Sequence, residues 1–398
     1  MPIVANSFSS SGRWPASVGR TAFACAMLLA CTMGMAEEKQ PVEKHVKVYY
    51  EPGRFGGWPA NHGIWSWGNE ILVGFSAGYY KDLGPDRHHI DRDKPERHLL
   101  ARSRDGGETW TIEDPAAAGY LLPQGDALHG TELPSVAIEE AADCPGGIDF
   151  THTDFAMTLR MDDTDAGTSR FYYSYDRGGS WQGPFRLPDF GTPGIAARTD
   201  YIVRGKHKCI AFLTAAKSNG KEGRPLCVET IDGGKTWRLV SSIGPEPEGF
   251  AIMPASVLLS ETDLLVVLRR REGPKRFLSA YASHDAGRSW EYLNDPVGDL
   301  GEGNPPSLVM LQDGRLCLTY GYRAAPFSMR ARLSGDGGQT WGPEIMLRED
   351  GANRDMGYPR SVQRPDGKVV TVYYFNDEKT GPERYIAATI WDPGKLDE

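Results

Sequence analysis

Arginines gather in this chain at places where short strands are expected to begin. They are Arg54, Arg160, Arg198, Arg269, Arg270, Arg271, Arg323, Arg330, Arg354 and Arg360. A guanidinium group offers two parallel N–H donors, which match the two oxygens of a carboxylate. Because the chain has a formal net charge of -9, an anionic ligand would need such a local basic cluster. The arginines therefore predict a site for a carboxylated molecule, with about half of them serving only as solvated strand-end charges.

Two other motifs that suggest chemistry have weaker support. Gly74–Gly78 has the glycine spacing of a serine-hydrolase nucleophile, but that motif needs a following helix, and residues 79–85 show no helical period. The adjacent His88 and His89 lack carboxylates at the spacing of metal ligands, so they are expected to line a pocket or to be exposed. No CxxC or HExxH segment occurs in the sequence. We therefore expect no metal and no cofactor.

An internal repeat indicates the elements that would position the arginines. Five segments fit the pattern S/T-x-D-x-G-x-x-W: Ser103–Trp110, Ser174–Trp181, Thr230–Trp237, Ser283–Trp290 and Ser334–Trp341. The aspartate can accept hydrogen bonds from backbone N–H groups, glycine permits positive φ, and tryptophan can pack between sheets. This is hairpin-turn chemistry, so we expect these aspartates to be structural. The spacing allows one four-stranded antiparallel blade for each repeat.

Composition and turn signals extend this pattern to residues 45–393. Glycine supplies 47 residues and proline 28, which favours many short strands joined by tight turns. Inner strands are expected to begin near residues 58, 154, 197, 253, 304 and 358, one more than the number of repeats. The predicted fold class is therefore all-β, a six-bladed β-propeller, with the strand-like His45–Tyr50 completing the last blade. A seven-bladed propeller is the alternative, but we assign the long first interval to a loop over residues 112–150.

Residues 1–36 have the features of a signal peptide. Arg13 and Arg20 precede an apolar stretch, and a small-residue cleavage site ends at Ala36, so the mature chain would begin near Glu37. The apolar stretch is too short to span a bilayer. We therefore expect the protein to be exported, to the periplasm or outside the cell.

A second form of export is also open. Leu28–Cys31 has the features of a bacterial lipobox, in which Cys31 is lipidated and becomes the new N-terminus. Among the other cysteines, Cys209 and Cys227 flank one predicted hairpin, and either a disulfide or two buried thiols fits. The acidic charge argues against nucleic acid or an anionic membrane as partner, and we expect a monomer.

The repeated hairpin resembles the Asp-box, or BNR repeat, of the sialidase (neuraminidase) superfamily, and the resemblance covers nearly the whole mature chain. Prolines near inner-strand starts, as in Trp58-Pro59, Met253-Pro254 and Tyr358-Pro359, accompany it. The resemblance implies a retaining exo-glycosidase that releases a terminal sialic acid or related carboxylated sugar from a glycan. Sialidases use a tyrosine nucleophile, since a carboxylate would be repelled by the anionic substrate.

The resemblance also implies catalytic roles for particular residues. Tyr358 falls where sialidases place their nucleophilic tyrosine. The glutamate that assists this tyrosine would fall near Met253, which cannot act as a base, so Glu248 is the nearest substitute and Glu302 the next.

The acid/base aspartate of sialidases lies shortly before the first Asp-box. Asp93 fits that position best, and Asp91 is second. A solvated loop acid is the alternative interpretation for so polar a segment.

The resemblance assigns the substrate carboxylate to a triad of arginines. Arg269 aligns with the second member, and Arg323 or Arg330 with the third. Gly57 occupies the position of the first member, and Arg54 is the nearest arginine. The predicted substrate-binding residues are Arg54, Arg198, Arg269, Arg323 and Arg330.

Two alternative functions remain open on the sequence. The missing glutamate and the displaced arginine also fit a propeller hydrolase or lyase that acts on another acidic polysaccharide. A glycan-binding propeller without catalytic activity is the third possibility, because the fold alone does not fix the reaction.

Overall fold

The computed structural model describes residues 41–122 and 140–396. The signal peptide and lipobox expected within residues 1–36 lie outside the described part. Within it, strands dominate: there are 25 of them, together with one short α-helix, α1 (Pro59–His62), and two 3-10 helices, η1 (Pro115–Ala118) and η2 (Pro393–Leu396). The predicted all-β class is confirmed.

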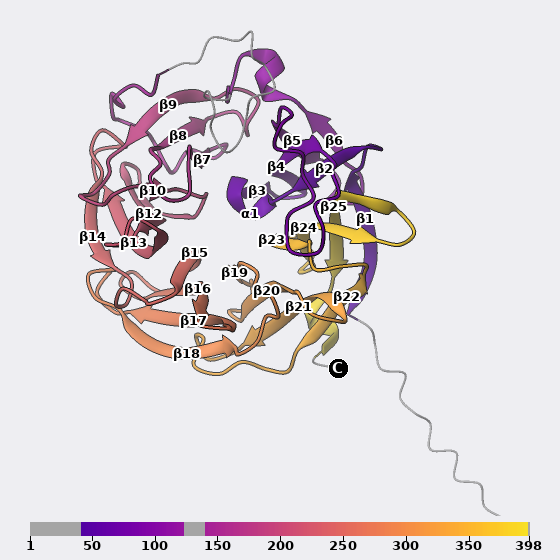
Figure 1. Cartoon of the computed structure of the whole chain (residues 1–398). Helices are drawn as coiled ribbons and strands as arrows, with labels where there is room; N and C mark the ends of the chain where they lie inside the picture. Colours follow the sequence, from indigo (N-terminus) through magenta and orange to yellow (C-terminus); the bar gives the residue numbers. More distant parts are fainter. Residues whose placement is uncertain (1–40, 123–139, 397–398) are drawn as a thin grey trace, which may run out of the picture. The chain divides into compact units, whose positions relative to one another are not determined.

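The strands form six antiparallel sheets that follow one another around a ring, which makes each sheet a propeller blade (Figure 1). The first blade holds β2 (Arg54–Gly57), β3 (Ile64–Trp67), β4 (Glu70–Tyr79), β5 (Arg97–Ser103) and β6 (Thr111–Glu113). The second holds β7 (Ala156–Met161), β8 (Ser169–Ser174) and β9 (Gln182–Leu187). The third holds β10 (Ile195–Ala196), β11 (Tyr201–Gly205), β12 (Lys208–Ala216), β13 (Glu222–Thr230) and β14 (Arg238–Ser242).

The remaining three blades have four strands each. The fourth holds β15 (Phe250–Leu258), β16 (Leu264–Glu272), β17 (Lys275–Ser283) and β18 (Glu291–Val297). The fifth holds β19 (Ser307–Met310), β20 (Leu316–Tyr322), β21 (Phe327–Ser334) and β22 (Ile345–Gly351). The sixth holds β23 (Gly357–Gln363), β24 (Val369–Asp377), β25 (Gly381–Trp391) and β1 (Val42–Tyr49). The six-bladed prediction is confirmed.

The two ends of the described chain close the ring. β1 is the outer strand of the sixth blade, where it pairs antiparallel with β25 from Val42 opposite Trp391 to Tyr49 opposite Ile386. The strand expected at His45–Tyr50 therefore completes the last blade. β25 is therefore paired on both sides, and β1 forms the outer edge of the blade.

The second blade departs from the expected order. The strand start expected near residue 154 is that of β7, which pairs only with β8. The Asp-box turn follows β8, as it follows the third strand of other blades, so β7 occupies a second-strand position. Between β6 and β7 the described residues contain η1 and no named strand, which agrees with a loop in place of a seventh blade.

Each Asp-box forms the predicted hairpin turn. In the second blade, Asp176 accepts hydrogen bonds from the backbone N–H of Ser180 at 2.8 Å and from its hydroxyl at 2.6 Å. The Ser174 hydroxyl accepts one from the Gly178 N–H at 2.8 Å. The Trp181 indole donates to the Gly178 carbonyl at 3.1 Å. The carboxylates are thus occupied in holding turns, which explains why they are structural.

The tryptophans of the Asp-boxes join neighbouring blades. Trp237 lies 5.8 Å from Phe171 of the second blade, measured between ring centroids. Trp290 lies 6.1 Å from Phe212 of the third blade. Apolar burial between sheets is the main source of stability in such a ring. Cys209 and Cys227 are buried free thiols, so the cross-strand disulfide does not form.

Candidate functional site

Three inner segments begin with the same unusual backbone conformation. Trp58, Met253 and Tyr358 each precede a proline, and each has a positive φ, of 57°, 53° and 51°. Bulky residues rarely adopt this left-handed conformation, and it tends to occur at functional sites. The strand pairing shifts at the same points in β15 and β23. Met253-Pro254 and Tyr358-Pro359 therefore mark places where β15 and β23 are irregular, and Trp58-Pro59 marks the start of α1.

Tyr358 lies at the start of β23 and faces arginines from other blades. Its hydroxyl accepts a hydrogen bond from Nη1 of Arg269 in β16 at 3.3 Å. The Cζ atom of Arg323 lies 5.2 Å from the centroid of its ring. Its backbone N–H donates to Oδ1 of the buried Asn304 at 2.9 Å, which fixes the start of the strand.

The arginines dominate the electrostatics of this tyrosine. Burial by itself raises the pKa of Tyr358, but the positive charges of Arg269, Arg323 and Arg198 outweigh it and lower the pKa below its usual value. A cationic neighbour favours the phenolate over the phenol. The phenol oxygen is thereby prepared to act as a nucleophile or a base.

The three arginines are held in place by the blades around them. The Arg323 Nε donates to the Met356 carbonyl at 2.8 Å, and its Nη2 to the Tyr374 hydroxyl at 2.6 Å. Arg198 Nη1 lies 2.5 Å from Glu222 Oε1.

Arg269 has one N–H group that makes no hydrogen bond among the described residues. Its Nε is buried and has no hydrogen-bond partner in the described structure. Burial lowers its pKa, with the phenol of Tyr358 acting in the opposite direction. An incompletely paired buried guanidinium has a strong physical preference for an anionic partner. This site therefore suits a carboxylate.

Two predicted arginines lie elsewhere. Arg54 packs over the ring of Tyr79, with its Cζ 3.9 Å from the ring centroid. Arg330, on the third strand of the fifth blade, pairs with Glu344 at 2.8 Å. None of the contacts recorded for the described residues joins either arginine to Tyr358. The structure thus brings together Arg198, Arg269 and Arg323 of the five predicted residues.

The expected glutamate base does not reach Tyr358. Glu248 is exposed, and the contact recorded for it is through its carbonyl, which accepts a hydrogen bond from Lys217 Nζ at 3.0 Å. Glu302 is exposed as well. Met253, at the aligned position, packs against Ala60 and Ile252 in an apolar cluster that Tyr358 also contacts. The tyrosine therefore has an apolar neighbour where sialidases would place a carboxylate.

Glu222 is a site residue that the sequence did not reveal. It begins β13, holds Arg198, and its charge acts on Arg269. No sequence motif surrounds Glu222. The pairing of β12 with β13 is what brings it close to Arg198.

The loop between β4 and β5 contains the expected acid/base residue. The Asp93 side chain is 85% exposed and pairs with Lys81 at 3.0 Å. Asp91 pairs with the same lysine at 3.0 Å. Neither carboxylate has a recorded contact with Tyr358.

A histidine of the same loop lies beside Tyr358 instead. The ring centroid of His88 is 6.2 Å from that of Tyr358 and 5.3 Å from that of Trp58. Its Nδ1 lies 2.6 Å from Oδ1 of Asp355, a buried carboxylate just before β23. The sequence prediction of a pocket-lining histidine fits His88.

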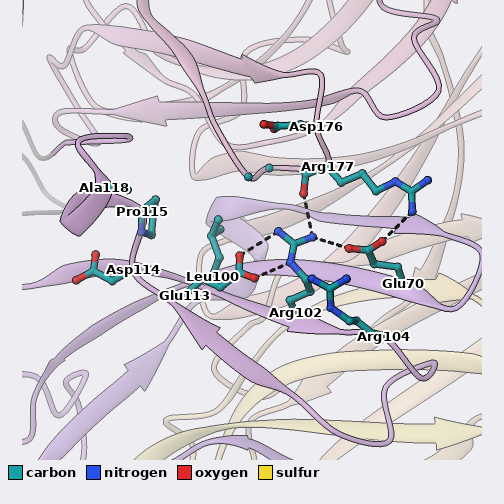
Figure 2. Close-up of a pocket in the computed structure, with 12 residues that line it drawn as sticks. Glu70, Leu100, Arg102, Arg104, Glu113, Asp114, Pro115, Ala118, Asp176 and Arg177 are labelled. Atoms are coloured by element: carbon teal, nitrogen blue, oxygen red, sulfur yellow. Dashed lines mark hydrogen bonds and ion pairs between the residues drawn. The ribbon is translucent and has the colours of Figure 1, made fainter.

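A separate pocket of about 540 Å³ lies between the first and second blades. Figure 2 shows Arg102 between two carboxylates: its Nη1 is 2.8 Å from Glu70 and its Nε is 2.6 Å from Glu113. Arg177 pairs with Glu70 on the other side at 2.8 Å. These charges neutralise one another, and none of the residues that line the pocket belongs to the Tyr358 site. The pocket is best explained as a junction between blades.

The fold and the site together define a six-bladed β-propeller in which a half-buried tyrosine faces a cluster of arginines. The chain belongs to the family of the BNR repeat-like domain, which matches residues 156–371. This agrees with the resemblance to the sialidase superfamily. No curated protein matches the chain.

Solved structures share this fold at low sequence identity. A Dyadobacter fermentans protein of unknown function is 20% identical, with a TM-score of 0.67 over 88% of this chain and 98% of that one. The NanB sialidase of Streptococcus pneumoniae is 12% identical, with a TM-score of 0.57 over 89% of this chain and 71% of that one. The Penicillium chrysogenum alpha-L-arabinanase is 14% identical, with a TM-score of 0.54 over 88% of this chain and 98% of that one.

Proposed function

We propose that the protein is a glycoside hydrolase that releases a terminal sialic acid, or a related carboxylated sugar, from glycans. The observation that carries the proposal is the contact between the Tyr358 hydroxyl and Arg269, reinforced by Arg323 and Arg198. These charges would hold the sugar carboxylate and stabilise the phenolate at the same place. Sialidases and an arabinanase among the proteins of similar fold are consistent with glycosidase chemistry.

The proposed mechanism is retaining. The Tyr358 oxygen attacks the anomeric carbon and forms a glycosyl-enzyme, which water then hydrolyses. A tyrosine suits this step because the arginines around it offset both the charge of its phenolate and the charge of the sugar carboxylate. The lowered pKa of Tyr358 makes its oxygen a better nucleophile without a glutamate in contact.

A lyase is the second candidate function, favoured by the lack of a recorded carboxylate contact to the Tyr358 hydroxyl among the described residues. A phenolate beside arginines could instead remove a proton next to a uronate carboxylate, because the arginines would stabilise the resulting negative charge.

A panel of glycosides tests these functions. Release of sialic acid from methylumbelliferyl sialoside would support the hydrolase. An unsaturated product from a uronate polymer, detected by its ultraviolet absorbance, would support the lyase. Binding of these sugars without turnover of any would indicate a glycan-binding propeller.

We further propose that the protein acts after export. The signal peptide and lipobox motifs support this, and both predicted mature ends, Glu37 and Cys31, precede β1 at Val42. Among the residues that the structure describes, no helix has the length and apolarity needed to cross a membrane. The intact mass of the natively exported protein distinguishes an end at Glu37 from a lipidated Cys31.

A further inference from the structure

The β4–β5 loop carries a histidine whose second nitrogen is available beside the nucleophile. Because the Asp355 carboxylate can only accept hydrogen bonds, His88 carries a proton on Nδ1. Its Nε2 has no hydrogen bond recorded in the described part of the chain, and 35% of its side chain remains exposed. The ring is therefore oriented by one nitrogen and open at the other.

Asp355 is built to hold this histidine. Its side chain is 2% exposed and accepts hydrogen bonds from the Tyr374 hydroxyl at 2.7 Å, the His89 backbone N–H at 2.9 Å and Arg384 Nε at 3.0 Å. Although burial opposes the charge, His88, Arg384 and Arg323 hold the pKa of Asp355 well below its usual value. A fixed, ionised carboxylate behind a histidine sets the tautomer of the ring and stabilises its protonated form.

We propose that His88, positioned by Asp355, is the acid/base residue of the reaction in place of Asp93. This rests on the proposed glycosidase function. His88 lies on the same loop as Asp93, but its ring faces Tyr358 while the Asp93 carboxylate faces solvent and Lys81.

His88 and Tyr358 together account for the protons and electron pairs of the two steps. In the first step His88 is the imidazolium, with protons on both Nδ1 and Nε2. The bond from the anomeric carbon to the leaving oxygen breaks, and that oxygen takes the Nε2 proton, which leaves neutral His88. The electron pair of the Tyr358 phenolate forms the new bond to the anomeric carbon. In the second step, neutral His88 takes a proton from water, whose oxygen bonds to that carbon, and the pair returns to the Tyr358 oxygen. The net reaction is glycoside plus water to sugar plus alcohol.

Charged and titratable groups from several elements surround His88, and they determine its pKa. Those that face it are Arg92 from its own loop, Asp355 and Tyr358 from the β23 region, Tyr374 from β24, and Arg323 at the end of the fifth-blade strand β20. Burial lowers the pKa of His88, and Asp355 opposes that effect. Because the first step needs protonated His88, loss of that proton should govern the alkaline limb of the kcat/KM profile, and burial should move this limb toward lower pH.

The test compares His88→Gln with Asp93→Asn in the full chain, on methylumbelliferyl sialoside and on sialyllactose. The fluorogenic aglycone leaves without protonation, whereas the sugar aglycone requires it. We expect His88→Gln to lower kcat/KM for sialyllactose by about 10²- to 10⁴-fold, and to affect methylumbelliferyl sialoside far less. Added azide, which needs no base, should speed turnover of the fluorogenic substrate and yield a glycosyl azide.

His89→Gln is the matched control, because the His89 ring stacks on Tyr80 at 6.0 Å and pairs with Asp82. It should leave both substrates unaffected. Equal losses on both substrates in His88→Gln, without azide rescue, would show a merely structural role and overturn the proposal. So would the leaving-group signature appearing in Asp93→Asn instead.

The same experiment distinguishes a failure of the proposed function from a failure of the His88 assignment. If the unchanged protein turns over neither sialoside, the glycosidase proposal falls, and the role of His88 falls with it. If the unchanged protein is active and His88→Gln behaves like the control, only the assignment of His88 is lost. A thermal melt of each variant identifies any that fail to fold, and for these Asp355→Asn provides the second variant, with the same leaving-group signature expected.

Discussion

The reactivity of the Tyr358 hydroxyl depends on the charged side chains around it. In the described part of the chain, its hydroxyl has one recorded hydrogen bond, from Arg269. The charges of Arg269, Arg323 and Arg198 act on the same oxygen, and together they overcome the effect of burial on its pKa. A phenol in this position has one proton to lose and no recorded carboxylate contact that would take it, so its reactivity depends on the arginines.

Replacing Tyr358 with phenylalanine tests this dependence. The ring and its packing remain, but the attacking oxygen is lost, so we expect turnover of methylumbelliferyl sialoside to fall by several orders of magnitude. The melting temperature should change little. Tyr322→Phe is the control, since among the described residues its hydroxyl bonds only to the exposed Asp299, at 3.3 Å. Near-normal turnover in Tyr358→Phe would contradict the proposed nucleophile.

Arg269→Lys separates charge from geometry. Lysine keeps the positive charge but cannot offer two parallel donors to a carboxylate. We expect KM for the sialoside to rise by about tenfold to a hundredfold, as for the loss of a charge-assisted hydrogen bond of about 1.5–3 kcal/mol. Arg271→Lys, an exposed position on the same strand, should have no effect. Steady-state kinetics measure both, and an unchanged KM in Arg269→Lys would place the substrate carboxylate elsewhere.

At the scale of elements, local chemistry explains what the sequence could predict. The hydrogen bonds that form the Asp-box turn lie within eight residues, as in Ser283–Trp290, so the hairpin can be recognised from sequence alone. Tyr358 and Arg269 were selected through the resemblance to sialidases, and the structure brings their side chains into contact.

Contacts between distant segments could not be predicted in this way. His88 and Asp355 are 267 residues apart, and only closure of the ring brings the first blade beside the sixth. Glu222 reaches Arg198 only through the pairing of β12 with β13. The sequence selected Asp93 in the β4–β5 loop, whereas the side chain of this loop that lies beside Tyr358 is His88, because no local pattern shows which side chain of the loop faces inward.

The Asp-box tryptophans should contribute to stability and not to activity. Trp237 is 7% exposed and packs against Phe171 of the neighbouring blade, so Trp237→Ala should lower the free energy of unfolding by about 3–5 kcal/mol. Ile231, in the same turn, is 50% exposed, and Ile231→Ala should have little effect. Urea unfolding gives both values. A stable but inactive Trp237→Ala protein would contradict this separation of stability from activity.

At the scale of the whole molecule, side chains from several blades meet near the inner strands. Arg360 of the sixth blade donates to the carbonyl of Ala60 in the first blade at 2.7 Å. Its Nη1 lies 4.0 Å from Asp200 of the third blade, and Ser256 of the fourth blade lies near the same carboxyl group. One buried carboxyl group is therefore shared by contacts that join blades across the ring.

Asp200 should make the stability of the ring depend on pH. Burial raises its pKa to about 7, more than the nearby Arg360 lowers it, whereas the unfolded chain has a value near 3.8. Between these two pH values the folded protein binds the proton more tightly, so the contribution of Asp200 is fully present below about pH 4 and is lost as the pH rises through about 7. Within that window, the free energy of unfolding should fall by up to about 1.4 kcal/mol for each pH unit because of this group.

Asp200→Asn removes the titrating proton while keeping the size of the side chain. Urea unfolding at a series of pH values between 4 and 8 should show a shallower decline, or none, in the variant, with the two proteins differing most in slope between about pH 5 and 7. Asp93→Asn is the control for this measurement, because Asp93 is 85% exposed and should leave the slope unchanged. Parallel curves for the unchanged protein and Asp200→Asn would mean that the carboxylate is already ionised in the folded ring, stabilised there by Arg360.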